Sequence, residues 1–337
     1  LRCLVGSEMC IRDSNKLTWE TSEQLDFGID LRFLADRLGF TMDYYHKTTK
    51  DLITTNTPPL EAGNSASPIN GGNVVNKGFD FELTWRDHIG DFKYSIAANL
   101  STLKNEVTYL DPTISRLNGA SVNKWSSATA FEKGLPVWYF RGYKTDGIDP
   151  ATGNVNFVDV NGDGTVNAND FTYIGSAIPD ITYGATLNME YKGFDFTMFI
   201  QGQAGNDILM GIIRTDRPAT NKLSLFYTDR WTPENPNASR PSATVDAKYW
   251  NSDQMLFNGS FMKIKQIQLG YSLPALVTNK LHIGHTRIYA SLDDFFTFTN
   301  YPGMDPEASS SDNNSIGIDR GFFPISKKVL FGLSLNF

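Results

Sequence analysis

One segment of the sequence carries oxygen side chains at a spacing that could bind a metal ion. Positions 1, 3, 5, 7, 9 and 12 of this segment are Asp159, Asn161, Asp163, Thr165, Asn167 and Asp170. Gly164 stands at position 6, where a calcium loop turns sharply, and Ca²⁺ prefers oxygen ligands. Position 12 departs from the EF-hand pattern, which has Glu there, and no helical pattern flanks the segment. The spacing predicts a structural Ca²⁺ loop, with an ion-free Asx-rich turn as the alternative.

The rest of the sequence offers no catalytic constellation. The histidines lie far apart or near a turn and have no metal-ligand spacing with cysteine; they are His46, His88, His282 and His285. We find no Ser-His-Asp arrangement, no phosphate-binding glycine loop and no zinc motif. Neighbouring carboxylates such as Asp293 and Asp294 would point to opposite faces of a strand. We therefore expect a protein that is not an enzyme.

The composition favours an all-β protein with many turns. Of the 337 residues, 40% are hydrophobic and 13% aromatic, and Phe and Tyr accompany frequent Gly, Asn, Thr and Ser. The net charge of −7 and the lack of basic runs argue against nucleic acid as a partner. No apolar run of about 18 residues is present, so a transmembrane helix is not expected.

Strict alternation of apolar and polar residues is the dominant pattern. In residues 24–33, Phe27 and Ile29 share one face, while Asp26 and Asp30 share the other. Successive side chains of a strand point to opposite faces, so each such segment is a strand with one apolar face. The candidate strands are 24–33, 38–47, 78–85, 91–101, 136–144, 181–191, 194–203, 262–273, 286–293 and 328–337.

The connections between these strands fall into two classes. Some are tight turns, at residues 35–37, 88–90 and 191–193, and others are long and polar, at 51–73, 146–179, 206–259 and 299–326. Short turns alternating with long loops are typical of an outer-membrane β-barrel, whose strands are about ten residues long. A soluble β-sandwich is the alternative, because it also alternates. The last strand ends on Phe337, as terminal barrel strands do.

The order of turns and loops tests the strand count. If Phe337 is periplasmic, loops 299–326, 206–259 and 146–179 are extracellular and turn 191–193 is periplasmic. With ten strands, the long connection 107–135 would be periplasmic, and the tight turns 35–37 and 88–90 would be extracellular. One further strand within 107–135 restores the rule that short turns are periplasmic and long loops are extracellular. We therefore expect about 10–11 strands, with no plug domain.

The first fourteen residues differ in character from the rest. Residues 1–14 do not have the long apolar run of a signal peptide, and they resemble translated sequencing-adapter sequence. We expect them to be an artefact, with a genuine peptide as the alternative. Both cysteines, Cys3 and Cys10, lie within this stretch, so residues 15–337 have no disulfide or thiolate site.

Several ordered motifs resemble the SusC/RagA family of TonB-dependent transporters. They include Asp43-Tyr-Tyr-His-Lys-Thr-Thr-Lys-Asp-Leu52, Asn76-Lys-Gly-Phe-Asp-Phe-Glu82, Gly142-Tyr-Lys-Thr-Asp-Gly147, Arg230-Trp-Thr-Pro-Glu-Asn-Pro236 and Ile264-Lys-Gln-Ile-Gln-Leu-Gly-Tyr-Ser-Leu-Pro274. The resemblance implies an antiparallel transmembrane β-barrel of about 22 strands in a Gram-negative, Bacteroidetes outer membrane. Residues 15–337 would be its C-terminal half. The signal peptide, TonB box and plug would lie outside this chain.

The resemblance also implies a function and partners. Members of the family import oligosaccharides or peptides, are driven by TonB, and work with a SusD-like surface lipoprotein. A siderophore or vitamin receptor and a soluble carbohydrate-binding β-protein are the alternatives. Four aromatic residues of the longest loop could stack on sugar, contact the lipoprotein or pack within the loop; they are Tyr227, Trp231, Tyr249 and Trp250. No residue is identified as substrate-binding.

Overall fold

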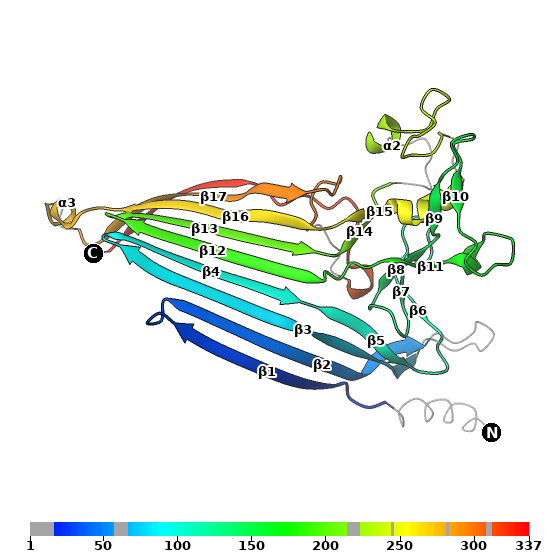
Figure 1. The fold of residues 1–337 in the computed structure, drawn as a ribbon, viewed down its shortest axis with the longest axis horizontal. Coiled ribbons are helices and arrows are strands. Elements are labelled where there is room, and N and C mark those ends of the chain that lie inside the picture. Colours follow the sequence, from blue (N-terminus) through cyan, green and yellow to red (C-terminus); the bar gives the residue numbers. More distant parts are fainter. Residues whose placement is uncertain are drawn as a thin grey trace, which may run out of the picture.

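A long, twisted antiparallel sheet dominates the molecule (Figure 1). The computed structural model describes residues 17–56, 67–213, 223–243, 246–280, 283–307 and 312–336. The strands of this sheet are β1 (Thr21–Phe33), β2 (Leu38–Asn56), β3 (Ser67–Ile89), β4 (Phe92–Thr102), β5 (Lys104–Leu110), β12 (Ile181–Tyr191), β13 (Phe194–Ala204), β16 (Phe261–Ser272), β17 (Thr286–Thr299) and β19 (Lys328–Leu335). The order is β1-β2-β3-β4-β12-β13-β16-β17-β19, and β5 pairs with β3.

The ten strands of this sheet make nine passes, because β4 and β5 follow each other along the same neighbour, β3. The expected number of about 10–11 strands is therefore met, but not by the expected segments. Residues 136–144 do not cross with the sheet: β8 (Tyr139–Gly142) belongs to a separate four-stranded sheet. The expected extra pass within 107–135 is also wrong: β5 ends at Leu110 and only continues the pass of β4 along β3, while β6 (Leu117–Asn118) and β7 (Thr129–Phe131) join that same small sheet.

With nine passes, the short turns lie at one end of the sheet and the long loops at the other, which is the arrangement that the extra strand was meant to produce. The tight connections β1–β2, β3–β4 and β12–β13 all lie at one end of the sheet, which we call the turn end. The long connections lie at the opposite end, which we call the loop end. Removing one strand from the predicted set changes the end at which each earlier connection lies, as adding one strand would. The short apolar and aromatic run at 136–144 could not distinguish a strand of the small sheet from one of the large sheet.

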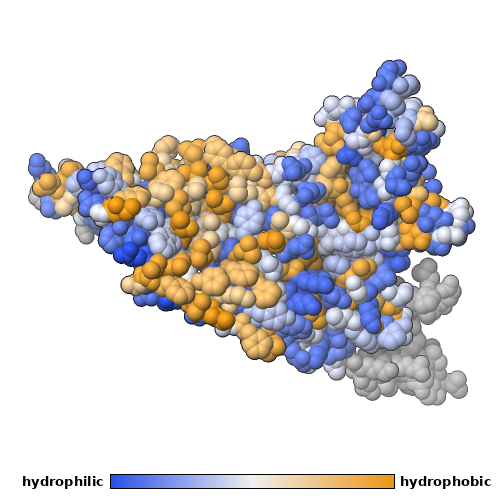
Figure 2. All heavy atoms as spheres, in the orientation of Figure 1, coloured by the Kyte–Doolittle hydropathy of each residue, from blue (hydrophilic) through white to orange (hydrophobic). Residues whose placement is uncertain are grey.

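Cross-strand register gives the large sheet two chemically different faces. One row of partners is entirely apolar and consists of Trp85, Ile96, Leu187, Met198, Ile267, Leu292 and Val329. The adjacent row is polar from β3 to β17, with Arg86, Ser95, Asn188, Thr197, Gln268 and Ser291, and it ends at Leu330 of β19. Because side chains alternate along each strand, the rows point to opposite faces. Figure 2 shows apolar residues over the strands and more polar residues over the loop end.

The apolar face is exposed to solvent in the isolated sheet. Phe27 of β1 is 64% exposed and Phe331 of β19 is 83% exposed. Such a large apolar surface needs a partner, which for a barrel is lipid. No helix in the described part of the chain is long and apolar enough to span a membrane. The longest described α-helix is α3 (Ala275–Lys280), at the turn end, and the shorter α2 (Leu225–Thr228) lies at the loop end.

Three long connections pack into one body at the loop end, which we call the loop body. It comprises the described parts of residues 111–180, 205–260 and 300–327. Its further strands are β9 (Thr145–Ile148), β10 (Val155–Phe157), β11 (Thr172–Gly175), β14 (Asp207–Met210), β15 (Leu256–Asn258) and β18 (Ile318–Asp319). Its 3-10 helices are η2 (Ala168–Asp170), η3 (Ala247–Asn251), η4 (Asp253–Met255) and η5 (Asn313–Ser315).

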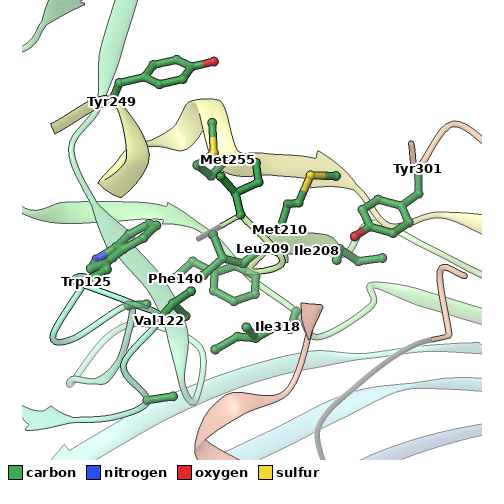
Figure 3. Packing of buried hydrophobic residues seen from close by; sticks show 14 of the residues in the cluster. Val122, Trp125, Phe140, Ile208, Leu209, Met210, Tyr249, Met255, Tyr301 and Ile318 are labelled. Atoms are coloured by element: carbon green, nitrogen blue, oxygen red, sulfur yellow. The ribbon is translucent and has the colours of Figure 1, made fainter. Parts of the chain in front are cut away.

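The larger hydrophobic core cluster of the described residues lies in this loop body, and a smaller one joins Val74 of β3 and Val107 and Leu110 of β5 to Ile114 and Phe131. Trp125, Phe140, Leu209 and Ile318 come from all three connections and are at most 1% exposed (Figure 3). β14 pairs with β15 on one side and with β18 on the other, which joins the second connection to the third. These connections, predicted only as long polar loops, thus contain strands of their own. The predicted loop 51–73 was wrong for much of its length, because β2 runs to Asn56 and β3 begins at Ser67.

Candidate functional site

The polar face of the sheet and the loop body above it form the candidate site. The polar face carries charged pairs that span more than one strand. Arg287 of β17 donates from Nε to Asp195 of β13 at 2.9 Å, across the intervening β16. Gly270 of β16 makes this possible, because a Cβ there would meet both side chains at 2.5 Å. Sequence alternation places both charges on this face, but only the sheet order brings them together.

A buried ion-pair cluster joins the third long connection to the polar face of β16. Lys263 Nζ lies 2.6 Å from Asp305 Oδ1, and the two side chains are only 3% and 7% exposed. Glu307 contacts both Lys263 and Lys265, and Lys265 also pairs with Asp294 at 2.8 Å. The register between β16 and β17 shifts at this point, which brings Lys265 and Asp294 together. The cluster therefore holds residues 305–307 against the polar face of the large sheet.

Asp305 is held ionised by its surroundings. Burial raises its pKa, but the hydrogen bond from Lys263 and the backbone N–H groups of Ile325 and Glu307 outweigh this and leave the pKa below its ordinary value. A carboxyl whose pKa is depressed on folding contributes stability above its unfolded pKa and loses it as the pH falls. The cluster is therefore a neutral-pH connection that acid would weaken.

A cleft of about 390 Å³ lies where the loop body meets the large sheet. Three carboxylates line it, those of Glu106, Asp180 and Asp207, together with the half-exposed side chain of Tyr173. Burial raises the pKa of Asp207, and the charge of Asp180 raises it further. Lys104 and Glu106 line the same cleft and offset each other in charge. Polar and aromatic groups that converge in a cleft are typical of a ligand site.

The aromatic residues of the longest connection mostly pack within the loop body. The Trp250 ring lies 5.0 Å from Tyr249 and 5.6 Å from Phe226. Trp231 donates to the Pro150 carbonyl at 2.9 Å and packs on Gly153, where a Cβ would meet the indole ring at 2.4 Å. Internal packing thus accounts for Trp231, Tyr249 and Trp250. Tyr227 is 52% exposed and remains free to contact a ligand or a partner.

The predicted calcium loop is a closed turn on the exposed side of the loop body. Asp159 accepts hydrogen bonds from the N–H groups of Gly162 and Gly164, both at 2.7 Å. Asp170 is fully buried and accepts from Val160 and Asn161 with one oxygen and from Asn167 with the other. These backbone hydrogen bonds, that of Asn167 foremost, lower the pKa of Asp170.

The remaining predicted ligands are turned partly toward one another. Asn161 Nδ2 donates to Asp163 Oδ2 at 3.1 Å, and Asp163 Oδ1 accepts from the N–H of Thr165. Asn167 accepts from Asn169 and caps η2. In the described part of the chain, no three or more Asp, Glu, His or Cys residues are grouped to hold a metal. The set therefore fits Ca²⁺ in composition and order, but Asn161 and Asp163 would have to turn to bind it.

The sequence did not indicate which charged residues are buried in the loop body or where the loop body meets the large sheet. Lys263 lies on the polar side of a predicted strand, but Asp305 lies in the predicted polar loop 299–326, where no pattern indicates a partner. Arg141 lies in a segment predicted as a strand of the large sheet and is 8% exposed. The only available signal was a charged residue beside consecutive aromatics, at Tyr139, Phe140 and Arg141. The predicted artefact at residues 1–14 and the terminal Phe337 lie outside the described residues.

Comparison with protein families identifies one matching model. The model described as "TonB dependent receptor-like, beta-barrel" matches residues 9–197. Among curated proteins, TonB-dependent receptor P3 of Formosa agariphila is 31% identical over 96% of this chain and 35% of its own length. TonB-dependent receptor SusC of Bacteroides thetaiotaomicron is 26% identical over 96% of this chain and 32% of its own length. The chain thus spans about a third of the length of these relatives.

Comparison with solved structures gives the same architecture. The structure of the RagAB peptide transporter superposes with a TM-score of 0.79 at 26% sequence identity. The match covers 95% of this chain and 35% of that one. The "closed-closed" state of the RagAB peptide importer gives a TM-score of 0.80 at 25% identity. The similarity therefore extends over the large sheet and the loop body together.

Proposed function

The chain belongs to the family of TonB-dependent receptor β-barrels, which are outer-membrane proteins, and from this premise we propose that it forms part of an importer of oligosaccharides or peptides. The main support for this proposal is that the two faces of the large sheet differ in polarity. One face is apolar and suited to lipid, and the other is polar, carries charged groups and lies beneath the packed loop body. Transport without catalysis is the proposed role. The turn end is periplasmic and the loop end extracellular in this assignment.

We propose that the chain completes its barrel with further strands of a longer protein. Within the described residues, β1 and β19 each pair on one side only, and open sheet edges are not tolerated in lipid. Residues 15–337 would be the C-terminal part of that barrel. TonB would act through a region outside this chain, and a SusD-like lipoprotein would cover the loop end. The similarity to SusC and to RagAB supports this partnership.

Extraction of the complete native protein tests the membrane assignment. We expect it to resist buffer and alkaline carbonate and to leave the membrane only in detergent, because its apolar face needs lipid or detergent cover. We also expect a lipoprotein to co-purify, and cells lacking the protein to lose uptake of its substrate. Release into buffer would favour the soluble carbohydrate-binding alternative. Detergent extraction with siderophore uptake and no lipoprotein would favour the siderophore receptor.

Calcium binding to the loop 159–170 remains a second proposal. Its support is the order of oxygen side chains, together with Gly164 at φ +83° at the turning position. Bound Ca²⁺ would stiffen an exposed turn of the loop body. We expect equilibrium dialysis of the complete protein to give one bound ion with a Kd of roughly 10⁻⁴–10⁻³ M, as in extracellular modules.

The variant Asp163→Ala should weaken calcium binding at least about tenfold, since it removes one carboxylate ligand from the set. Asp146→Ala is the matched control, because Asp146 belongs to β9, outside the loop. Equal calcium affinity in Asp163→Ala and the parent protein would refute the assignment. So would the absence of any binding at millimolar Ca²⁺.

A further inference from the structure

A row of basic side chains crosses the apolar face of the large sheet near the loop end. His46 of β2 is the cross-strand partner of Lys77 of β3, and Lys77 is the partner of Lys104 of β5. Two residues nearer the turn end, the same face carries Tyr44 and Phe79, whose ring centroids lie 5.2 Å apart. Because side chains alternate along a strand, the three basic groups project from the apolar face. We call them the basic row.

The basic row lies where the outer boundary of the membrane is expected. On this face of β3, Lys77 bounds the apolar part toward the loop end and Asp87 bounds it toward the turn end. Between them the face carries only Phe79, Phe81, Leu83 and Trp85. The ten residues from Lys77 to Asp87 extend about 33 Å along the strand. A tilt of about 40° reduces this to about 25 Å across the bilayer, which is the height of the apolar band of such barrels.

The basic row has no anionic partner in the part of the chain that the structure describes. Lys77 and Lys104 stand directly opposite each other, and like charges in this position destabilise a pair of strands. Within the described residues, the three basic side chains form no hydrogen bond or ion pair, and Glu106, one row nearer the loop end, is paired with neither lysine. An anion shared by the three groups would therefore stabilise the row.

The basic charge on this face is confined to one part of the sheet. Among the described strands of the large sheet, the basic side chains on the apolar face all belong to β2, β3 and β5; they are His46, Lys50, Lys77 and Lys104. Lys50 is already paired with Glu23 at 2.7 Å. The polar face, by contrast, holds its cations in ion pairs such as Lys263 with Asp305. The basic row is thus a single, local site.

We propose that the basic row binds the phosphate group of an outer-leaflet lipid, whose acyl chains lie against the aromatic side chains nearer the turn end. Neighbouring strands lie about 4.8 Å apart, so three basic groups on adjacent strands can converge on one phosphate. Phe27 and Phe79 are 64% and 38% exposed and offer the apolar surface. Lysines near a membrane surface attract anionic headgroups, and aromatic rings are favoured at the interface. The proposal concerns the lipid around the barrel and not the imported substrate.

Native mass spectrometry of the complete receptor in dodecyl maltoside micelles, a phosphate-free detergent, tests the contact. The probes are lipid A, whose sugars carry phosphate, and the same lipid A after its phosphates have been removed. We expect Lys77→Gln to bind lipid A about fivefold more weakly than the parent, the effect of one lysine near an anionic lipid surface. The double variant Lys77→Gln with Lys104→Gln should bind about 25-fold more weakly. Dephosphorylated lipid A should bind weakly, and equally to the parent and the variants.

Lys47→Gln is the matched control for the loss of one positive charge. Lys47 follows His46 on β2 and is the partner of Asn76, so its side chain projects from the polar face. This variant should bind lipid A as the parent does. Lys77→Arg should also retain binding, because a guanidinium pairs well with phosphate. Heat-modifiable electrophoretic mobility establishes that each variant is folded.

Equal binding of lipid A and its dephosphorylated form by the parent receptor would overturn the proposal. Equal affinities of Lys77→Gln and Lys47→Gln for lipid A would do the same. Displacement of lipid A by inorganic phosphate at millimolar concentration would indicate a site for free phosphate and would overturn the lipid assignment. None of these outcomes contradicts import, which fails only if the complete protein is released by buffer or supports no uptake.

Discussion

Replacing Lys263 with methionine is expected to destabilise the attachment of the third long connection by about 3–5 kcal/mol, the usual cost of breaking a buried ion pair. The ammonium group is enclosed between Asp305 and Glu307, and its removal leaves the buried Asp305 carboxylate without its cation. Asp305 would retain only the N–H groups of Ile325 and Glu307. Limited proteolysis of residues 300–327 in the complete protein measures the loss, as faster cleavage.

Lys50→Met provides the matched control for this prediction. Lys50 pairs with Glu23 at 2.7 Å, almost the same distance as the Lys263–Asp305 pair, but the two side chains are 41% and 65% exposed. Exposed pairs contribute about 0–1 kcal/mol, so cleavage should change little. The double variant Lys263→Met with Asp305→Leu should recover most of the loss, because a buried pair replaced by apolar groups is often neutral. Equal effects of Lys263→Met and Lys50→Met would show that burial of the pair has no influence.

Replacing Ile267 with arginine is expected to impair folding of the barrel by about 2–4 kcal/mol, the cost of a cation on the lipid face near the bilayer middle. Ile267 lies near the middle of β16, in the apolar row between Met198 and Leu292. A guanidinium there would have no water and no partner in the hydrocarbon. Urea-dependent folding into lipid vesicles, followed by electrophoretic mobility, measures the difference.

The neighbouring variant Gln268→Arg separates the two faces of the same strand. Gln268 lies in the polar row between Thr197 and Ser291, and a cation there would face the barrel interior. We expect Gln268→Arg to fold with a change of less than about 1 kcal/mol, since interior positions of such barrels are polar. If Gln268→Arg is the more damaging of the two, the assignment of the faces is reversed.

The faces of the large sheet could be predicted because they depend only on a local pattern. Residues 24–33, 91–101 and 181–191 alternate without interruption, and they correspond to β1, β4 and β12 within a few residues. A one-residue error would move every apolar side chain to the other face, so the pattern defines each face strongly. The tight turns were also predictable, as at Gly193, where φ is +87°.

The destination of a strand could not be predicted from the same pattern. Residues 136–144 are rich in the apolar and aromatic residues that strands favour, but β8 pairs with β7 and β11 in the loop body. Its neighbours are chosen by contacts made far along the chain, such as Thr129 with the carbonyl of Asn314 at 2.6 Å. Periodicity identifies an extended segment and its faces, but it contains no information about which strand lies beside it.

The sequence by itself determined the all-β class, the two faces of the large sheet and, through ordered motifs, membership of a transporter family. Only the tertiary structure decided that the long connections form one packed body, that Lys263 meets Asp305 and that Arg141 is buried beside Phe171. The physical reason is the range of the forces involved. Alternation arises from the geometry of neighbouring residues, whereas the pairing of Lys263 with Asp305, or of β14 with β18, is selected by the packing of the whole loop body.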